Sequence, residues 1–257
     1  MGVSVASSSL LTPADPAPVD LVNGESDAPV LLLCEHAGNH VPASLGDLGV
    51  SAEILTSHRG YDIGAEGVAR ALADLLNAPL ILQRYSRLVI DANRPPSSPQ
   101  AMLEISDGAT IPGNQNLGAA NRQARISEIF DPMDQAIAQG FAAHPRRAAF
   151  SIHSFTPRLG DEDRPWQAGF LSRKSLPTAE HLMACLARQA PAFNLALNKP
   201  YQIEDATDWF IPRHAEPRGL PHCLIEIRND QIQTQDQGAR WAALLANAIK
   251  ELPEIWP

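Results

Sequence analysis

The sequence predicts an α/β fold built around a mostly parallel β-sheet. Its 257 residues, 44% of them hydrophobic and 19% charged, fit one large domain that can bury a full core. The run Val30–Cys34 is continuously apolar rather than alternating, as in a strand that is covered on both faces. Further apolar runs also stop abruptly at polar side chains, and open α/β sheets bind ligands beyond the carboxyl ends of their strands.

Composition narrows the class of protein. The formal net charge of −9 argues against binding to nucleic acid or to anionic membranes. Three cysteines, Cys34, Cys185 and Cys223, lie far apart in apolar segments, so we expect buried reduced thiols. No run reaches the ~18 apolar residues that span a bilayer, and residues 1–17 have no basic leader. We therefore expect a cytoplasmic protein with a loose arm at 1–20 and a single domain at 21–257, and no protein partner is indicated.

Periodicity and breakers place the elements along the chain. The clearest helix is Ala65–Leu76, because its apolar residues recur on one face. Pro132 should kink or split the helix expected at 121–140. Residues 95–117 lack a period and should form a long loop near the site. The other expected helices are 52–55, 178–190 and 237–252, and the other expected strands are 79–83, 87–90, 148–152, 166–171 and 223–230.

Polar residues follow several of these strands. His36 comes after the first strand, Arg94 after the run 87–90, and His153 after the run 148–152. Each has an ordinary alternative: a histidine can cap a loop, and an arginine can form a surface ion pair. Glu226 and Arg228 are two apart in a strand and project from the same face, which is costly in a buried strand unless they pair or serve a site.

These residue types suit metal-dependent hydrolysis. His36, His153 and one carboxylate are the ligands that a catalytic Zn²⁺ uses. Glu226 would then be a free carboxylate that moves the proton, while Arg94 and Arg228 would orient an acidic substrate and stabilise an oxyanion. Asp62, just before the helix Ala65–Leu76, either caps that helix or turns into the site as a ligand. The chain has no HExxH motif and no cysteine cluster, so spacing alone does not require a metal.

Two other functions compete with this one. A serine hydrolase would use Ser154, but the chain has no GxSxG motif, and adjacency in sequence does not place this hydroxyl against His153. Cys34 is a weaker nucleophile because it lies within the apolar run. A catalytically weak or metal-free binding or regulatory protein on the same scaffold is the other alternative, since a fold does not fix a function.

Six segments resemble the N-formylglutamate amidohydrolase family: residues 35–42, 61–65, 86–95, 151–157, 164–166 and 225–230. The resemblance covers roughly residues 29–245. The family is similar to zinc carboxypeptidase and aspartoacylase-type hydrolases, which implies a three-layer α/β/α sandwich of the phosphorylase/hydrolase-like kind with a mixed, mostly parallel sheet. It also implies hydrolysis of a small acidic N-acyl amino acid, by default N-formylglutamate to formate and glutamate, with other N-acyl amino acids open.

The resemblance also implies roles for individual residues. His36 and His153 match zinc ligands, Glu226 matches the general base, and Asn93 with Arg94 matches the pair that binds the substrate carboxylate. Asn39 departs from the pattern, because it stands where the relatives carry a glutamate ligand, so either Asp62 supplies the third ligand or metal binds weakly. The expected site therefore has Zn²⁺ on His36, Asp62 and His153, chemistry from Glu226 and Arg228, and substrate contacts from Asn39, Asn93, Arg94, Ser154 and His214.

Overall fold

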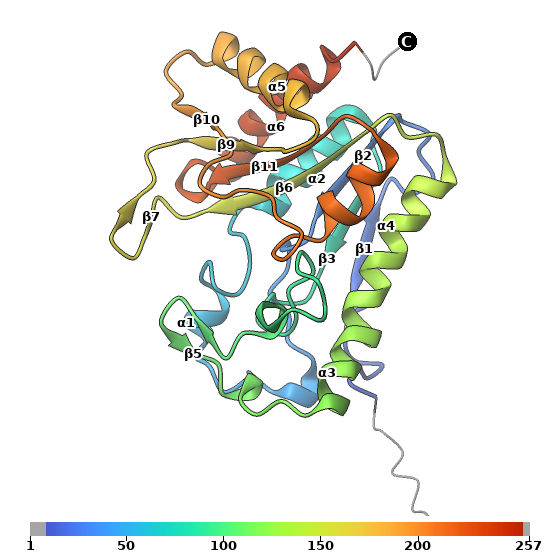
Figure 1. Cartoon of the computed structure of the whole chain (residues 1–257), viewed down its shortest axis with the longest axis vertical. Coiled ribbons are helices and arrows are strands. Elements are labelled where there is room, and N and C mark those ends of the chain that lie inside the picture. The colour runs from blue at the N-terminus through green and yellow to red at the C-terminus, as the bar shows by residue number, and fades with distance from the viewer. Residues whose placement is uncertain (1–8, 254–257) are drawn as a thin grey trace, which may run out of the picture.

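The computed structural model describes residues 9–253, and a seven-stranded sheet forms its centre (Figure 1). The strands lie in the order β1-β3-β2-β6-β11-β9-β10. Four of the six pairings are parallel, and only β1 with β3 and β9 with β11 are antiparallel. The expected mixed, mostly parallel sheet is confirmed. The strands are β1 Val19–Val22, β2 Val30–Cys34, β3 Leu80–Gln83, β6 Ala148–Phe155, β9 Ala168–Leu171, β10 Leu195–Leu197 and β11 His222–Arg228.

Helices cover both faces of the sheet, which confirms the three-layer architecture. On one face, α2 (Ala65–Leu76), α5 (Leu176–Gln189) and α6 (Gln235–Lys250) share a core with alternate strand residues such as Leu32. On the other face, the neighbouring Leu31 and Leu33 pack with α4 (Asp131–Ala143) and the helical turn Ile211–Ala215. Because both sets of alternate residues are apolar, β2 has the uninterrupted run that the sequence shows.

A third apolar cluster lies outside the sheet, and it explains an error in the sequence prediction. The predicted strand at 87–90 is wrong, because residues 87–89 form a turn. Leu88, Val89 and Ile90 are apolar because they are buried against loop residues such as Leu48. The hydroxyl of Ser86 accepts a hydrogen bond from the backbone N–H of Leu88 and holds the turn. A buried turn and a short strand carry the same apolar signal.

The helix expected at 121–140 is three consecutive segments. They are α3 (Ala119–Arg125), a π-helical turn at Ile126–Phe130, and α4. Pro132 lies in the first turn of α4, where a missing backbone N–H is tolerated. The other predicted elements of the sheet and its helices are confirmed to within a few residues, and the three cysteines are free and buried as expected.

The expected N-terminal arm, residues 1–20, is only partly described, and residues 1–8 lie outside the described range. Its described part is attached to the domain. Leu10 is buried, and its backbone N–H donates to the carboxylate of Glu128. The arm then leads into β1, which pairs with β3.

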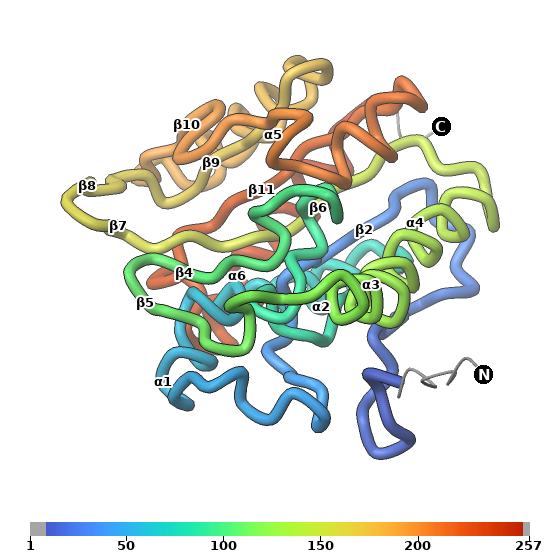
Figure 2. Tube along the Cα trace, turned by 60° about the horizontal axis from the view of Figure 1, so that its bottom comes forward, coloured from blue at the N-terminus to red at the C-terminus, as the bar shows by residue number. Residues whose placement is uncertain are grey.

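The remaining elements are short. They are α1 Ala52–Leu55, the strand pairs β4 Ile105–Ser106 with β5 Ala109–Thr110 and β7 Arg158–Leu159 with β8 Glu162–Asp163, and the 3₁₀ turns Ala43–Leu45, Pro99–Met102, Pro112–Asn114, Glu216–Arg218 and Asn229–Gln231. The β7–β8 hairpin projects from the left of the molecule, and α1 lies near β5 (Figures 1 and 2). The segment expected to be a long loop, 95–117, contains the β4–β5 pair and two of these 3₁₀ turns, and its other residues are irregular.

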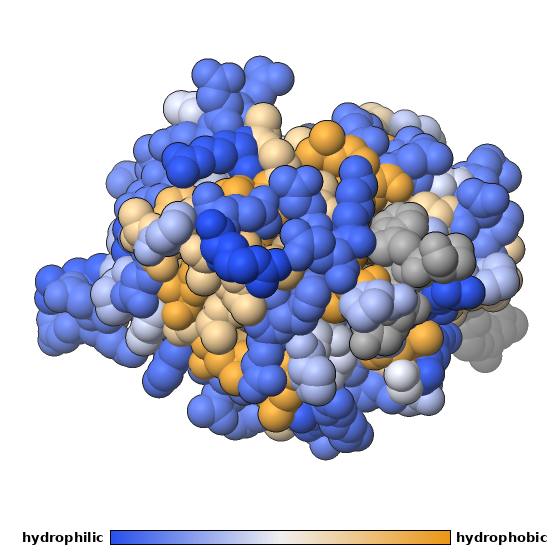
Figure 3. Space-filling model, turned by 90° about the horizontal axis from the view of Figure 1, so that it is seen from above, coloured by the Kyte–Doolittle hydropathy of each residue, from blue (hydrophilic) through white to orange (hydrophobic). Residues whose placement is uncertain are grey.

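The surface seen from above is mostly hydrophilic, with small apolar areas between hydrophilic side chains (Figure 3). Among the described residues, no helix is long and apolar enough to cross a membrane. Large exposed hydrophobic side chains are scattered over separate elements: Leu21, Leu75, Leu103, Ile105, Leu176 and Tyr201.

Candidate active site

The carboxyl ends of three adjacent parallel strands form one wall of a cavity of about 590 Å³. His36 follows β2, His153 lies near the end of β6, and Glu226 lies near the end of β11. The parallel register places Glu226 directly beside His153. The cavity is lined by His36, Asp62, Arg87, Asn93, Arg94, His153, Ser154, Leu171, Tyr201, Gln202, Glu204, Thr207, Asp208, Leu224 and Glu226.

His36, Asp62 and His153 form a compact buried group of nitrogen and oxygen donors. One ligand atom from each lies within 4.8 Å of the others. Asp62 Oδ2 is 2.9 Å from Nδ1 of His153 and 3.5 Å from Nδ1 of His36. The loop before α2 brings Asp62 here, because its backbone N–H donates to the carbonyl of His36. Burial opposes ionisation of Asp62, but the two imidazoles hold its pKa below the usual value.

A carboxylate supports each imidazole from behind. Nε2 of His36 lies 2.7 Å from Oδ1 of Asp91, and Nε2 of His153 lies 3.1 Å from Oε2 of Glu35. Carboxylates accept, so Nε2 carries a proton in both rings. Nδ1 of both rings faces Asp62, and Nδ1 of His153 is close enough to donate to Asp62 when that ring is doubly protonated. This is the arrangement in which outer carboxylates orient metal-binding histidines. Burial lowers the pKa of His153, but Glu35 and Asp62 raise it well above the usual value.

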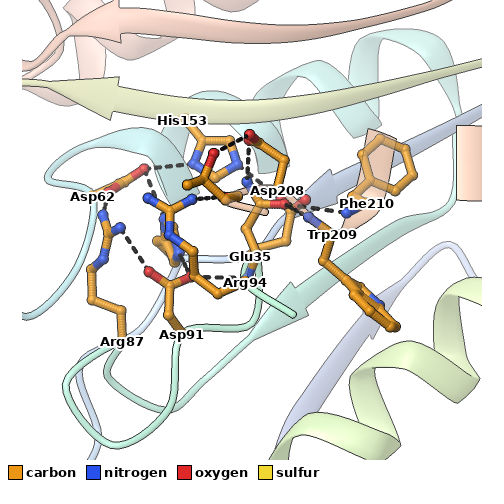
Figure 4. Close-up of polar contacts among 12 residues, drawn as sticks. Glu35, Asp62, Arg87, Asp91, Arg94, His153, Asp208, Trp209 and Phe210 are labelled. Atoms are coloured by element: carbon orange, nitrogen blue, oxygen red, sulfur yellow. Dashed lines mark hydrogen bonds and ion pairs between the residues drawn. The ribbon is translucent and has the colours of Figure 1, made fainter. Parts of the chain in front are cut away.

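Arg87 links the two aspartates of this network (Figure 4). Its guanidinium donates to Asp62 over 3.3 Å and to Asp91 over 2.8 Å. Burial disfavours its charge, but Asp91 and Asp62 keep the pKa of Arg87 above its ordinary value. Arg87 therefore fixes the positions of Asp62 and Asp91 and is not free to bind a substrate carboxylate.

Glu226 is buried at the cavity and lacks a fixed cationic partner among the described residues. Its Oε2 has no hydrogen-bond partner there. Burial raises the pKa of Glu226 to about 7, with His153 lowering it and Asp62 raising it. A carboxylate that titrates near neutral pH suits proton transfer.

Residues 201–208 form the wall opposite the strand ends. Arg94 donates to the carbonyl of Thr207, and the side-chain oxygen of Asn93 accepts from the backbone N–H groups of Trp209 and Phe210. Asp208 Oδ2 accepts from the backbone N–H of Glu204. Burial raises the pKa of Asp208. Asn93 is therefore used to position this wall, whereas Arg94 keeps further donors for a ligand.

Gly169 allows the chain to reach this wall. Gly169 lies beside Glu226 in β9, on the same face of the sheet. A Cβ atom at this position would overlap the carbonyl oxygen of Lys199. The backbone of Lys199 thus passes where a side chain would stand, and Tyr201 follows it into the cavity wall.

The structure brings seven of the ten expected site residues to the cavity and places three elsewhere. Asn39 donates to the carbonyl of Leu55 and lines a separate cavity of about 320 Å³. His214 lies 2.6 Å from Asp134 of α4 and supports the helical turn beneath the sheet. Arg228 turns to Asp230. These three side chains have local partners that sequence position alone does not reveal.

Ser154 lines the cavity but is not set up as a nucleophile. Its hydroxyl donates to the carbonyl of Ile63, and its backbone N–H donates to Asp62. Cys34 is fully buried, and burial raises its pKa well above the usual value. Neither nucleophile is therefore placed to attack a substrate in the cavity.

Sequence reasoning missed Glu35, Asp91, Arg87, Tyr201 and Asp208. The first three carried a signal, since each lies within three residues of an expected site residue or in a segment shared with the family. Tyr201 and Asp208 had none, because only the folded chain brings residues 201–208 opposite the strand ends.

The donor set fits a divalent metal ion. His36 Nδ1 is buried without a hydrogen-bond partner among the described residues. Both nitrogens of His153 face carboxylates, which stabilises a proton at the position that a cation would take. Two imidazoles and one carboxylate are the ligand types of catalytic zinc sites that keep a position open.

The comparisons with known proteins agree with this interpretation of the fold. The sequence model described as N-formylglutamate amidohydrolase matches residues 28–233. Gene product Atu2144 from Agrobacterium tumefaciens is 37% identical, with 95% of this chain and 100% of that chain covered and a TM-score of 0.89. N-formylglutamate amidohydrolase from Ralstonia eutropha JMP134 is 18% identical, with 91% and 96% covered and a TM-score of 0.64. No curated protein matches this chain in sequence.

A three-layer α/β/α fold whose cavity gathers two histidines and four carboxylates, two of them beside the histidines at the strand ends, has the make-up of an amidohydrolase. The extent of the sequence match makes the assignment specific. This chain belongs to the N-formylglutamate amidohydrolase family.

Proposed function

We propose that this protein is a zinc-dependent amidohydrolase that cleaves the amide bond of a small N-acyl amino acid. N-formylglutamate, which gives formate and glutamate, is the first substrate to test because the family is named for it. The observation that carries the proposal is the buried donor group. His36 Nδ1 is without a hydrogen-bond partner among the described residues and faces Asp62 and His153.

In this proposal His36, Asp62 and His153 hold the metal. When bound, Zn²⁺ supplies a Lewis acid for the amide carbonyl and for the attacking water. Glu35 and Asp91 fix the imidazoles so that Nδ1 of each ring faces Asp62, where the three side chains would hold the metal. Arg87 keeps Asp62 and Asp91 in place.

Glu226 is the proposed general base. It accepts a proton from the attacking water and delivers it to the departing nitrogen, so that the amine leaves neutral. Its raised pKa of about 7 supports this exchange, because the carboxylate takes and returns a proton near neutral pH. Arg94 binds the carboxylate of the substrate through its free guanidinium donors. Ser154 lines the same cavity, and its hydroxyl oxygen can accept a hydrogen bond from the substrate while it donates to the carbonyl of Ile63.

The test is formate release from N-formylglutamate and related N-formyl amino acids. Purified protein should lose activity after chelation and regain it with added Zn²⁺. Full activity after prolonged chelation, with metal content measured as absent, would contradict the metal. Absence of hydrolysis across a panel of N-acyl amino acids by zinc-loaded protein would contradict the amidohydrolase function.

A further inference from the structure

We infer that the cavity selects N-acyl amino acids with a single carboxylate, and disfavours dicarboxylates such as N-formylglutamate. The preferred side chain is uncharged or positively charged. This inference rests on the proposed function and sharpens the substrate class of the same site. It follows from the charged groups around the cavity, with Arg94 binding one substrate carboxylate and the rest of the substrate reaching the wall that carries Glu204.

The first step is the number of arginines available to a carboxylate. Arg87 and Arg94 are the two arginines among the lining residues. Arg87 is already bound to Asp62 and Asp91. Arg94 uses one terminal nitrogen on the carbonyl of Thr207 and can offer the rest of its planar fork to one carboxylate. Arg94 is thus the one lining arginine that can bind a substrate carboxylate, so the cavity provides for one such group.

The second step is that nearby arginines are engaged behind the cavity wall. Arg228 forms an ion pair with Asp230 and donates to the carbonyl of Arg164. Arg164 is buried, its guanidinium stacks 4.9 Å from the Tyr201 ring, and it donates to the Tyr201 hydroxyl over 2.8 Å. Neither Arg164 nor Arg228 is among the lining residues.

The third step is the charge of the wall that faces the strand ends. Glu204 and Asp208 both line the cavity, on the segment that holds Arg94 through Thr207. A second substrate carboxylate would meet these two acids without a free arginine to offset them, and juxtaposed like charges oppose binding. An amide or ammonium group there would instead find an acceptor in the exposed carboxylate of Glu204, since the oxygens of Asp208 already accept from Asn93, Glu204 and Thr207. Wall charge and arginine count therefore point to the same substrate class.

N-formylglutamine and N-formylglutamate form a matched pair that differs mainly in one charge. Zinc-loaded Glu226→Gln protein, which lacks the proposed base, allows binding to be measured without turnover. We expect N-formylglutamine to bind about tenfold or more tightly, which corresponds to about 1.4 kcal/mol. The wild type should show the same order in kcat/KM. Equal or tighter binding of N-formylglutamate, or no binding of either compound, would overturn the inference.

Charge variants on the wall locate the effect. Glu204→Gln should narrow the ratio between the two affinities severalfold. Asp205→Asn is the matched control, because Asp205 pairs with Arg173 and does not line the cavity, so it should leave the ratio unchanged. An unchanged ratio in Glu204→Gln would overturn the role of this wall. If binding has the expected order but the wild type hydrolyses neither compound, the proposed function fails separately.

Discussion

The imidazole rings of His36 and His153 stand edge to face, with 4.9 Å between their centroids and 83° between their planes. They come from positions far apart in the chain, but neighbouring strands β2 and β6 deliver them to the same edge of the sheet. Each ring has a carboxylate on its far side and shares Asp62 on its near side. Asp62 and the two rings therefore form one buried group of donors to which a metal ion can bind.

The first prediction concerns metal binding. Purified protein should bind one equivalent of Zn²⁺, and His153→Ala or Asp62→Asn should reduce its affinity strongly. Because His153 has a raised pKa, a proton competes with the metal, so affinity should fall as pH is lowered. Metal content after dialysis provides the measurement. His58→Gln is the control, since His58 pairs with Asp107 away from the cavity. Unaltered zinc content in both site variants would contradict the assigned ligands.

The second prediction concerns the carboxylates behind the rings. Glu35→Gln and Asp91→Asn should each weaken zinc binding by about 10- to 100-fold, because an amide is a poorer acceptor for the imidazole N–H. Competition with a chromogenic chelator measures this change. Asp107→Asn, which alters an exposed acid, provides the comparison. Zinc affinities equal to that of the wild type would show that Glu35 and Asp91 do not support metal binding through the histidines.

The third prediction concerns Glu226 as the base. Glu226→Gln should lower kcat by about 10²- to 10⁴-fold with intact zinc content. In the wild type, kcat/KM should fall as pH drops below the pKa of Glu226, because the protonated acid cannot accept a proton. That limb lies at or below about 7, since a bound cation favours the carboxylate. If the variant keeps the wild-type kcat and the same fall of kcat/KM at low pH, Glu226 is not the general base.

The fourth prediction concerns stability without metal. The pKa of Glu226 is raised from 4.5 to about 7 on folding, so the stability that its protonation contributes is fully present below pH 4.5 and is lost as pH rises through 7. In the Glu226→Gln variant the side chain stays neutral throughout. The metal-free variant should therefore gain on the order of 3 kcal/mol relative to wild type between pH 4.5 and pH 8. Urea unfolding at pH 4.5 and pH 8 measures the free energy of unfolding of both proteins. A difference between variant and wild type that is the same at the two pH values would contradict the prediction.

The fifth prediction concerns Arg94. Arg94→Lys should raise KM by about 10- to 100-fold, since hydrogen bonds to charged groups contribute about 1.5–3 kcal/mol. The planar fork is lost although the positive charge stays. A substrate analogue with its carboxylate converted to an amide should respond much less to this substitution. If both compounds lose affinity equally, Arg94 supports only the Thr207 segment.

The sequence predicted a strand correctly where both faces of the strand are buried. Val30–Cys34 could be placed because both of its faces are apolar. That His153 and Glu226 lie side by side depends on the register of β6 with β11, which only the structure gives. The run 87–90 misled because its burial comes from loop packing. Local periodicity reports that a residue is buried, but it does not report which element covers it.

The site was only partly predictable for a related reason. The expected residues that do lie at the cavity are His36, Asp62, His153, Asn93, Arg94, Ser154 and Glu226. Asn39, His214 and Arg228 have side chains of suitable chemistry, but their orientation depends on Leu55, Asp134 and Asp230. Glu35 and Asp91 act through the histidines rather than on the cavity, so their importance emerges only from three-dimensional contacts.

The close passage of the Lys199 backbone over Gly169 gives a way to sort related chains. A relative with any larger residue at the equivalent place has to route the following segment differently, and its Tyr201 equivalent would then stand elsewhere. Substrate range among such proteins should therefore divide according to this one small residue, even where every histidine and acid is retained.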